Sequence, residues 1–292
     1  MNTAPNPLLL ALLGDPVSHS VSPAMQSAAL AAKGLDGIYI PIQVGVSNLD
    51  SAVRGLAALG FRGANITLPH KETILPMLDA ISDDARDLGA VNTIVIDRDG
   101  AGASRVVGHN TDHLGVVYAL KEAGHSIRGS RAIVIGAGGA ARAAVFGLIR
   151  SQANEIVILA RRADQGARIV RELGSSGTHL RVRRFDAENL IRESERATLL
   201  IHATPIGMWP KTSNSVWPDL RPIPSHLTVF DVVYTPTTTK LMLQAKASGV
   251  PIVSGLEMLV CQAAQSFLLW TDREAPVGAM RDAAHRALEE AV

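Results

Sequence analysis

A glycine-rich hexapeptide at 136–141 carries the clearest chemical signal in this sequence. It consists of Gly136, Ala137, Gly138, Gly139, Ala140 and Ala141, which matches G-x-G-x-x-G/A. An apolar run at 132–135 precedes it, and a helical run at about 140–150 and a second apolar run at 156–160 follow. Small residues let the backbone approach a pyrophosphate closely, and free N–H groups at a helix start stabilise its charge. The pattern predicts a dinucleotide site within a strand–helix–strand unit, with an ordinary glycine turn of an α/β sheet as the alternative.

Two arginines at the end of the second of these strands bear on which dinucleotide binds. NAD sites usually place Asp or Glu near this point to hold the ribose 2′-hydroxyl. Here the strand ends in Arg161 and Arg162, and the first acidic residue is Asp164. Guanidinium groups offer paired donors and positive charge to a 2′-phosphate. We therefore expect NADP and leave use of NAD open; the alternative is that the two arginines simply begin a solvated helix.

Lys71, at the start of a short predicted helix, has the chemistry of a proton donor or acceptor. The segment Pro69-His70-Lys71-Glu72 begins that helix directly after a strand-like stretch. The positive end of a helix disfavours a protonated amine, which suits a lysine that must release a proton. On composition alone, a solvent-facing Lys71 beside Glu72 explains the same residues equally well.

Hydroxyl groups gather at a different predicted helix start. Ser18, Ser20 and Ser22 precede Pro23, and proline in a first helical turn marks a helix N-terminus. Ser22 is the expected N-cap, and this expectation leaves Ser20 unexplained.

A further polar segment surrounds Asp112, whose simplest interpretation is that it caps the helix that follows. His109, Asp112 and His113 are close enough in the sequence to suggest a metal site. No additional His or Cys at a suitable spacing supports such a site, so we expect no metal.

Strand-like and helical segments alternate along the chain, which is typical of an α/β protein with parallel sheets. The expected strands are 8–13, 38–44, 63–67, 89–96, 106–108, 132–135, 156–160, 180–184, 198–203, 227–233 and 251–253. The expected helices are 23–33, 49–59, a short one from 69, one ending at 124, and 140–150, 239–247, 255–270 and 276–290. We expect residues 113–254 to form a doubly wound nucleotide domain, and residues 1–112 to form a second α/β domain that the last two helices, within 255–292, rejoin. Ligand is expected between the domains, at the carboxyl ends of the nucleotide strands.

Composition excludes several classes of partner. The chain has 292 residues and a formal net charge of +1, and only 4% of its residues are aromatic. These values give no reason to expect nucleic acid or an anionic membrane as a partner. The apolar stretch at 8–13 lacks preceding basic residues and is short for a signal peptide, so we interpret it as a strand. The single cysteine, Cys261, suits a reducing cytoplasm and is expected to be a buried thiol.

Segments spread over nearly the whole chain resemble the shikimate dehydrogenase family. They are SHSVSP at 18–23, GANITLPHKE at 63–72, GAVNT at 89–93, NTD at 110–112, the glycine motif at 136–141, ATPIGM at 203–208, DVVY at 231–234 and GLEMLVCQAA at 255–264. Several motifs in the same order are more specific than any one of them. The resemblance implies a substrate-binding catalytic domain, 1–112 with 255–292, and an NADP-binding Rossmann domain, 113–254.

The same resemblance implies an activity and a role for each candidate residue. The implied reaction is the reversible NADPH-dependent reduction of 3-dehydroshikimate to shikimate, a step of aromatic amino acid biosynthesis. Lys71 and Asp112 are the implied catalytic pair. The implied substrate ligands are Ser20, Ser22 and Tyr234 around the carboxylate, and Thr67, Asn92, Asp112 and Gln262 around the ring hydroxyls. The implied cofactor contacts are residues 136–141, Arg161, Arg162, Thr204, Gly255 and Met258.

Departures from the family's pattern keep alternatives open. NADP-preferring members often carry Asn-Arg-Thr-x-x-Arg after the second Rossmann strand, whereas this chain keeps Arg161 and has Gln165 at the last position. His70 and His113 stand where the family commonly has an aromatic residue and a glycine. One alternative is a dehydrogenase of quinate or an amino analogue that uses NAD or both cofactors. Another is a non-catalytic regulator that binds nucleotide or a shikimate-type ligand. A homodimer is also left open.

Overall fold

The chain forms two compact units. The computed structural model describes residues 7–98, 103–174 and 177–290. One unit combines Met1–Thr111 with Gln262–Val292, and the other is Asp112–Cys261. The helix expected to begin at Gly255 therefore contributes residues to both units.

The first unit is built on a six-stranded sheet. Its strands are β1 (Leu8–Gly14), β2 (Gly37–Gln43), β3 (Gly63–Ile66), β4 (Ala80–Ile81), β5 (Thr93–Arg98) and β6 (Ser104–His109). Its helices are α1 (Ser22–Ala32), α2 (Leu49–Leu59), α3 (His70–Thr73), α4 (Asp83–Leu88), the C-terminal part of α10 (Gly255–Thr271) and α11 (Val277–Glu290), with 3₁₀ turns at Val46–Asn48 and Leu75–Met77.

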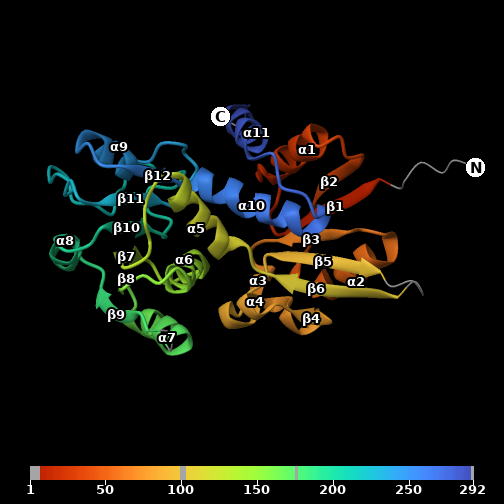
Figure 1. Ribbon diagram of the computed structural model, residues 1–292, viewed down its shortest axis with the longest axis horizontal. Coiled ribbons are helices and arrows are strands. Elements are labelled where there is room, and N and C mark those ends of the chain that lie inside the picture. Colours follow the sequence, from red (N-terminus) through yellow and green to blue (C-terminus); the bar gives the residue numbers. More distant parts are fainter. Residues whose placement is uncertain (1–6, 99–102, 175–176, 291–292) are drawn as a thin grey trace, which may run out of the picture. The chain divides into compact units, whose positions relative to one another are not determined.

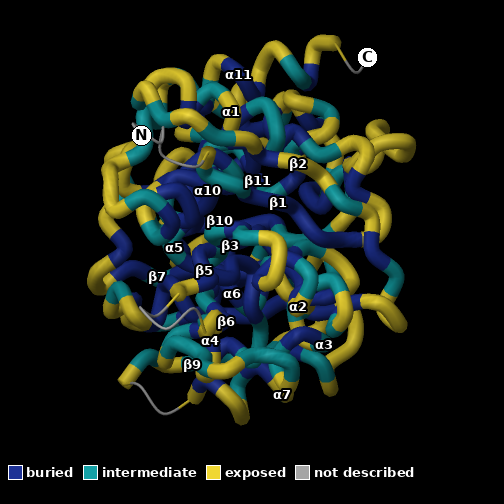
Figure 2. Tube along the Cα trace, turned by 90° about the vertical axis from the view of Figure 1, so that its right-hand side faces the viewer, coloured by how far each residue is buried: buried dark blue, intermediate teal, exposed yellow. Residues whose placement is uncertain are grey.

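The sheet of the first unit is mostly parallel and contains one antiparallel insertion. The strand order is β2-β1-β3-β5-β6-β4. The pairs β1–β2, β1–β3 and β4–β6 are parallel, whereas β3–β5 and β5–β6 are antiparallel. The leucine-rich β1 runs between two neighbours and is buried, as its dark blue trace in Figure 2 shows. Because β5 is antiparallel to β3, the first residues of β5 lie beside the last residues of β3, at the carboxyl end of β3.

The C-terminal helices belong to the packing of the first unit. Helix α11 packs beside α1, and Figure 1 shows the two side by side. The buried Gln26 side chain of α1 also donates a 3.0 Å hydrogen bond to the backbone oxygen of Ala263 in α10. These contacts hold the C-terminal part of α10, which contains Gln262, in the first unit.

The second unit is a doubly wound parallel sheet. Its strands are β7 (Arg131–Ile135), β8 (Glu155–Ala160), β9 (His179–Arg184), β10 (Leu199–His202), β11 (Thr228–Asp231) and β12 (Ile252–Ser254). Its helices are α5 (Asp112–Glu122), α6 (Gly139–Arg150), α7 (Ala163–Leu173), α8 (Ala187–Ser194), α9 (Lys240–Ala247) and the first part of α10.

The strand order of the second unit identifies its fold. The order is β12-β11-β10-β7-β8-β9, which Figure 1 shows along the unit, and every pair is parallel. This is the arrangement of dinucleotide-binding domains, in which the first strand lies centrally and the later strands continue on its other side. The predicted α/β class and the Rossmann arrangement are therefore confirmed. The order reverses between β7 and β10, so the carboxyl ends of these two strands border the crevice in which such sheets bind ligand.

An ion-pair network closes the opposite end of this sheet. The guanidinium of Arg131 contacts Glu155 at 3.0 Å and Glu193 at 2.8 Å. Arg181 contacts the same two carboxylates, and the Glu193 side chain is only 6% exposed. Three strands and α8 are thus joined by charges far from the glycine turn, which gives this end a structural role.

Several local predictions were incomplete or wrong. The strand expected from Gly89 begins at Thr93, because Gly89 ends α4 in the left-handed conformation, with φ of +61°. Helix α4 itself was not predicted, nor were α8 and the two-residue strand β4, and α7 was anticipated only in the alternative that Arg161 and Arg162 begin a solvated helix. Strand and helix signals are weakest in such short or strongly charged segments, where only one face packs on the sheet.

Candidate active site

The glycine turn of the second unit lies at the reversal of strand order. Gly136 follows β7 with φ of +122°, a backbone conformation that residues with a side chain rarely adopt. A Cβ atom added there would stand 2.5 Å from the backbone oxygen of Ala203, which follows β10. Only glycine therefore lets the ends of β7 and β10 approach this closely.

Gly138 and Gly139 differ from Gly136, because the protein's own packing does not require them to be glycine. A Cβ atom added at either position would meet no atom within 4 Å. Gly138 has φ of −86° and ψ of −171°, which other residues adopt, and it caps α6 without a side-chain hydrogen bond. The N-terminus of α6 therefore faces open space with free N–H groups, and these residues fit a pyrophosphate.

Basic side chains follow the end of β8 in this unit. Arg161 and Arg162 follow that strand and are both exposed. In the neighbouring helices, Arg142 of α6 and Arg168 of α7 both bond to Glu172. These hydrogen bonds, from Arg168 and then Arg142, lower the pKa of the Glu172 carboxyl. Glu172 is thus an anion already paired, while the two arginines after β8 face solvent.

The other predicted cofactor residues lie on segments that leave the same sheet. Thr204 is two residues beyond the end of β10, and Gly255 begins α10 with Met258 buried in its first turn. Tyr234, predicted to lie near the substrate carboxylate, follows β11, and burial raises the pKa of its phenol.

Sequence reasoning missed a buried histidine–aspartate pair at this edge. His202 is the last residue of β10, and its Nδ1 atom lies 2.9 Å from Oδ1 of Asp231, the last residue of β11. A polar residue ending each of two apolar strands was the available signal, and it needs the strand pairing to become meaningful.

The first unit contains a buried cluster of amides and hydroxyls at the meeting point of β3, β5 and α10. Asn92 donates from Nδ2 to Oγ1 of Thr111 at 2.9 Å and to Oε1 of Gln262 at 3.2 Å. Asn65 donates from Nδ2 to Oγ1 of Thr93 at 3.1 Å and to Oγ of Ser266 at 3.0 Å. The cluster thus joins two predicted substrate ligands, Asn92 and Gln262, to side chains without a predicted role.

The cluster extends to a buried phenol. Tyr39 donates its hydroxyl to Oδ1 of Asn65 over 2.8 Å, and burial raises the pKa of this phenol strongly. The phenol therefore stays neutral and fixes the orientation of the Asn65 amide. Asn65 lies within the GANITLPHKE motif, but Tyr39 and Ser266 are distant in the sequence and carried no signal. The arrangement presents oriented amide and hydroxyl groups, which suits recognition of a polyhydroxylated ligand.

The predicted hydroxyl ligands lie in loops, or at the start of α1, beyond the ends of β1 and β3. Thr67 follows β3, and its N–H donates to the backbone oxygen of Leu13 at the end of β1. Ser20 follows β1, and its Oγ accepts the N–H of Ser22 at 3.2 Å. The expectation that Ser22 caps α1 was wrong, because the helix is preceded by Val21 and Ser22 is its first residue. Ser20 supplies the local hydrogen bond instead.

Lys71 sits on the four-residue helix α3, whose backbone is firmly held. Its carbonyl oxygen accepts the N–H of Val91 at 2.8 Å. The preceding His70 is fully buried, and its Nε2 atom lies 2.6 Å from the backbone oxygen of Val44, so this nitrogen donates. Lys71 itself is partly buried. Asp112 begins α5 in the second unit and is also partly buried.

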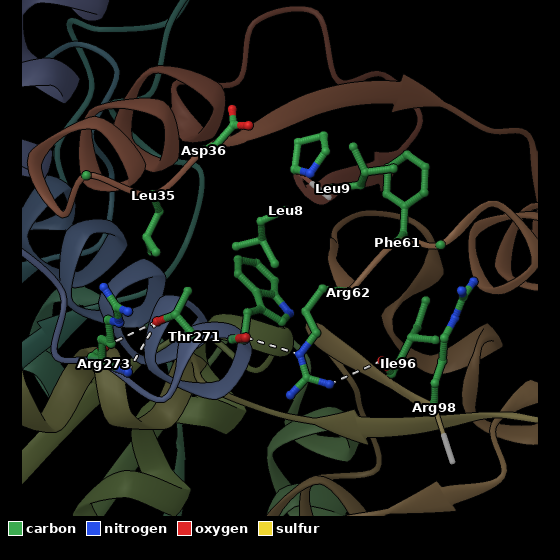
Figure 3. Close-up of a pocket in the computed structure, with 14 residues that line it drawn as sticks. Leu8, Leu9, Leu35, Asp36, Phe61, Arg62, Ile96, Arg98, Thr271 and Arg273 are labelled. Atoms are coloured by element: carbon green, nitrogen blue, oxygen red, sulfur yellow. Dashed lines mark hydrogen bonds between the residues drawn. The ribbon is translucent and has the colours of Figure 1, made fainter. Parts of the chain in front are cut away.

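A cavity of about 720 Å³ lies elsewhere on the first unit and is drawn in Figure 3. It is lined by residues 7–9, 34–36, 60–62, 96, 98, 270, 271 and 273, which include none of the predicted ligands. Arg62 donates to the backbone oxygens of Trp270 and Ile96 at 3.1 and 3.3 Å, as the dashed lines show. Arg98 likewise donates to the oxygen of Ala57 at 2.7 Å. These arginines therefore brace the cavity wall at the edge opposite to the polar cluster.

Within residues 7–98, 103–174 and 177–290, no group of three or more His, Cys, Asp or Glu side chains is arranged to hold a metal ion. His113 instead packs its ring edge-on against Phe146, with ring centroids 5.1 Å apart. Cys261 is buried, at 3% exposure. Over the same part of the chain, no helix combines the length and apolar character needed to cross a bilayer.

Comparison with known proteins gives consistent matches. Residues 12–94 match the family model of the shikimate dehydrogenase substrate binding domain, and residues 255–285 match that of the shikimate 5′-dehydrogenase C-terminal domain. A relative from Moorella thermoacetica, named shikimate dehydrogenase (NADP(+)), is 42% identical over 97% of this chain and 93% of its own.

Two solved structures have the same fold over nearly their whole length. Shikimate 5-dehydrogenase from Thermus thermophilus, in complex with NADP(H) and shikimate, is 36% identical with a TM-score of 0.84, covering 96% of this chain and 100% of its own. Ligand-free 5-ketofructose reductase of Gluconobacter sp. strain CHM43 is 30% identical with a TM-score of 0.88, covering 97% of this chain and 99% of its own.

The second unit has the sheet order and the open glycine turn of a nucleotide-binding domain. Together with the matches above, this identifies a nucleotide-dependent oxidoreductase. These sequence identities extend over nearly the full length of this chain and of each relative. The chain belongs to the shikimate dehydrogenase family.

Proposed function

We propose that the protein catalyses the reversible NADPH-dependent reduction of 3-dehydroshikimate to shikimate, a step of aromatic amino acid biosynthesis. The observation that carries this proposal is the 42% identity, over 97% of the chain, with a relative named shikimate dehydrogenase (NADP(+)). The buried cluster around Asn92 supports it, because amides and hydroxyls held in fixed orientations suit a ligand with several ring hydroxyls.

For the substrate, we propose that Ser20 and Ser22 bind the carboxylate, with Tyr234 nearby. Thr67, Asn92 and Gln262 are assigned to the ring hydroxyls. Two of these side chains already bond to each other, Asn92 Nδ2 donating to Gln262 Oε1 at 3.2 Å, so their amide orientations are mutually fixed. Fixed donors discriminate well against ligands that lack a matching hydroxyl.

For the chemistry, NADPH when bound supplies the hydride that goes to the carbonyl carbon. We assign Lys71 as the general acid that protonates the carbonyl oxygen, and as the base that removes the same proton in the reverse direction. Asp112 is assigned to orient Lys71 and a neighbouring substrate hydroxyl. We therefore assign residues 1–112 with 255–292 as the catalytic domain and residues 113–254 as the nucleotide domain.

Two further proposals concern the compartment and the assembly. The single cysteine supports a reducing compartment, and we propose the cytoplasm. We also propose a homodimer as the assembly to test first, by light scattering of the purified chain.

The structural likeness to 5-ketofructose reductase, and to a quinate dehydrogenase from Corynebacterium glutamicum in complex with NAD, supports a second candidate function, a dehydrogenase of another polyhydroxylated substrate such as quinate. Oxidation rates with shikimate and with quinate, each with NADP and with NAD, separate the candidates. We expect the highest rate for shikimate with NADP. Faster turnover of quinate would favour the second candidate. No turnover in any combination, with NADP still bound, would favour a non-catalytic regulator.

The two exposed arginines after β8 give a cofactor prediction. The double variant Arg161→Ala and Arg162→Ala should weaken NADP binding by about tenfold to a hundredfold, because charge-assisted bonds to the 2′-phosphate are lost. NAD, which lacks that phosphate, should bind as before. Calorimetric titration of both cofactors measures the two effects. Arg128→Ala, at an exposed position before β7 and thus at the opposite end of the sheet, is the matched control. Equal weakening of NADP and NAD would contradict the assignment.

A further inference from the structure

A line of hydrogen bonds at the carboxyl edge of the nucleotide sheet joins side chains from β10, β11 and the start of α9. His202 Nδ1 lies 2.9 Å from Asp231 Oδ1, and His202 Nε2 lies 2.6 Å from Thr204 Oγ1. Thr239 donates its hydroxyl to Asp231 Oδ2 at 2.5 Å, and the N–H of Val233 donates to Oδ1 at 3.0 Å. His202 and Asp231 are 1% and 0% exposed. Burying such a pair costs desolvation, so its presence needs an explanation.

For the neutral form of His202, the bonding pattern fixes where the protons lie. The carboxylate of Asp231 accepts from Val233 and Thr239, so it meets the Nδ1–H of His202 as a third donor. In the neutral ring, Nε2 is then an acceptor, and Thr204 donates its hydroxyl proton to it. Thr204 Oγ1 also accepts the N–H of Ile206 at 3.3 Å. The Thr204 oxygen is left with one lone pair and no proton to offer, so it can serve a ligand only as an acceptor.

The position of Thr204 indicates which part of a dinucleotide it faces. His202 pairs in register with Ile135 of β7, and the backbone oxygen of Ala203 lies against Gly136. In this fold a pyrophosphate lies over the glycine turn and the adenosine ribose over the end of β8. The nicotinamide half therefore extends over the other half of the sheet, toward β10 and β11.

We propose that His202 is a positioning residue for the cofactor. It holds Thr204 Oγ1 as an acceptor for the N–H₂ group of the nicotinamide carboxamide. The proposal rests on the proposed use of NADP. A purely structural pair would explain the contact of His202 with Asp231, which joins adjacent strands. The second contact orients the hydroxyl of Thr204, which lies beyond the strand in the loop that borders the cofactor crevice.

An analogue without the amide N–H₂ tests this directly. In 3-acetylpyridine adenine dinucleotide phosphate a methyl group replaces the N–H₂, while the carbonyl oxygen is kept. We expect the parent protein to bind this analogue about twofold to tenfold more weakly than NADP⁺, the range for one hydrogen bond. Thr204→Val should bind the two compounds equally. Thr204→Ser, which keeps the hydroxyl, should restore the difference.

His202→Asn isolates the contribution of Nε2. Its amide nitrogen can take the place of Nδ1 and keep the bond to Asp231, but nothing replaces Nε2. We expect this variant to lose the discrimination between the two compounds, and the double variant with Thr204→Val to lose no more. The matched control is His125→Asn, since His125 Nδ1 also contacts a threonine hydroxyl, Thr228 Oγ1, at 3.1 Å but away from this edge. Adenosine 2′,5′-bisphosphate should bind to all variants alike.

The result that would overturn the proposal is discrimination by His202→Asn equal to that of the parent. Nitrogen-15 NMR showing a proton on Nε2 rather than Nδ1 of neutral His202 would do the same. Both readouts are independent of turnover. If the parent protein oxidises shikimate but His202→Asn discriminates between the two compounds as the parent does, this inference is wrong and the proposed function still stands. Failure of NADP⁺ and of the bisphosphate to bind the parent would overturn both.

Discussion

Replacement of Lys71 by alanine should lower the turnover number for shikimate oxidation by about a hundredfold to ten-thousandfold, the range of general acid–base catalysis. The dissociation constant for NADP should stay within about twofold, because the glycine turn and the arginines after β8 lie in the other unit. The variant is expected to fold, since α3 is held through its backbone. The Val91 N–H bonds to the carbonyl oxygen of Lys71, and the buried His70 anchors the helix to Val44. Stopped-flow kinetics and calorimetry measure the two quantities.

A lysine elsewhere in the same unit provides the control for this variant. Lys33 follows α1, is likewise partly buried, and is expected to tolerate alanine with unchanged kinetics. A small primary amine added to Lys71→Ala should recover part of the lost rate, because it can occupy the vacated space and exchange the proton. Full activity of Lys71→Ala without added amine would remove the lysine from the mechanism.

The sequence predicted the nucleotide unit well because its signals are local. The apolar runs of β7 and β8, the glycine turn and the alanine-rich α6 follow one another within about 30 residues, a length typical of one strand–helix–strand unit. Helix α2 was predicted with its bounds, Leu49–Leu59, because an amphipathic pattern and a terminal glycine agree there. Such agreement between periodicity and capping is what makes an element predictable from sequence alone.

The polar groups could not be predicted in this way, because pairing over long distances defines them. Asn65 and Ser266 bond to each other across 201 positions, and His202 bonds to Asp231 across 29. Before the strand register is known, each is one polar residue beside an apolar run. The antiparallel direction of β5 was equally hidden, since alternation in a strand does not state its direction. Local capping also failed at Ser22, where the hydroxyl of Ser20 provides the bond.

Alanine substitutions at two glycines of one turn should affect different properties: Gly136→Ala should lower stability, and Gly138→Ala should weaken cofactor binding. Gly136→Ala is expected to lower the melting temperature by roughly 5 to 10 °C, from backbone strain at positive φ plus the clash with Ala203. Gly138→Ala should leave the melting temperature unchanged, because its backbone is extended and a Cβ atom meets nothing within 4 Å.

The effect of Gly138→Ala should appear in cofactor binding instead. A methyl group at the N-terminus of α6 occupies the space in which the pyrophosphate approaches the free N–H groups, and those bonds are charge-assisted. We expect the dissociation constant for NADP to rise by about tenfold to a hundredfold, corresponding to one such bond. Thermal unfolding and calorimetric titration of the same preparations separate the two effects. The open space at Gly138 is then explained by the ligand rather than by the protein, whereas a Gly138→Ala variant that bound NADP as tightly as the parent would place the pyrophosphate elsewhere.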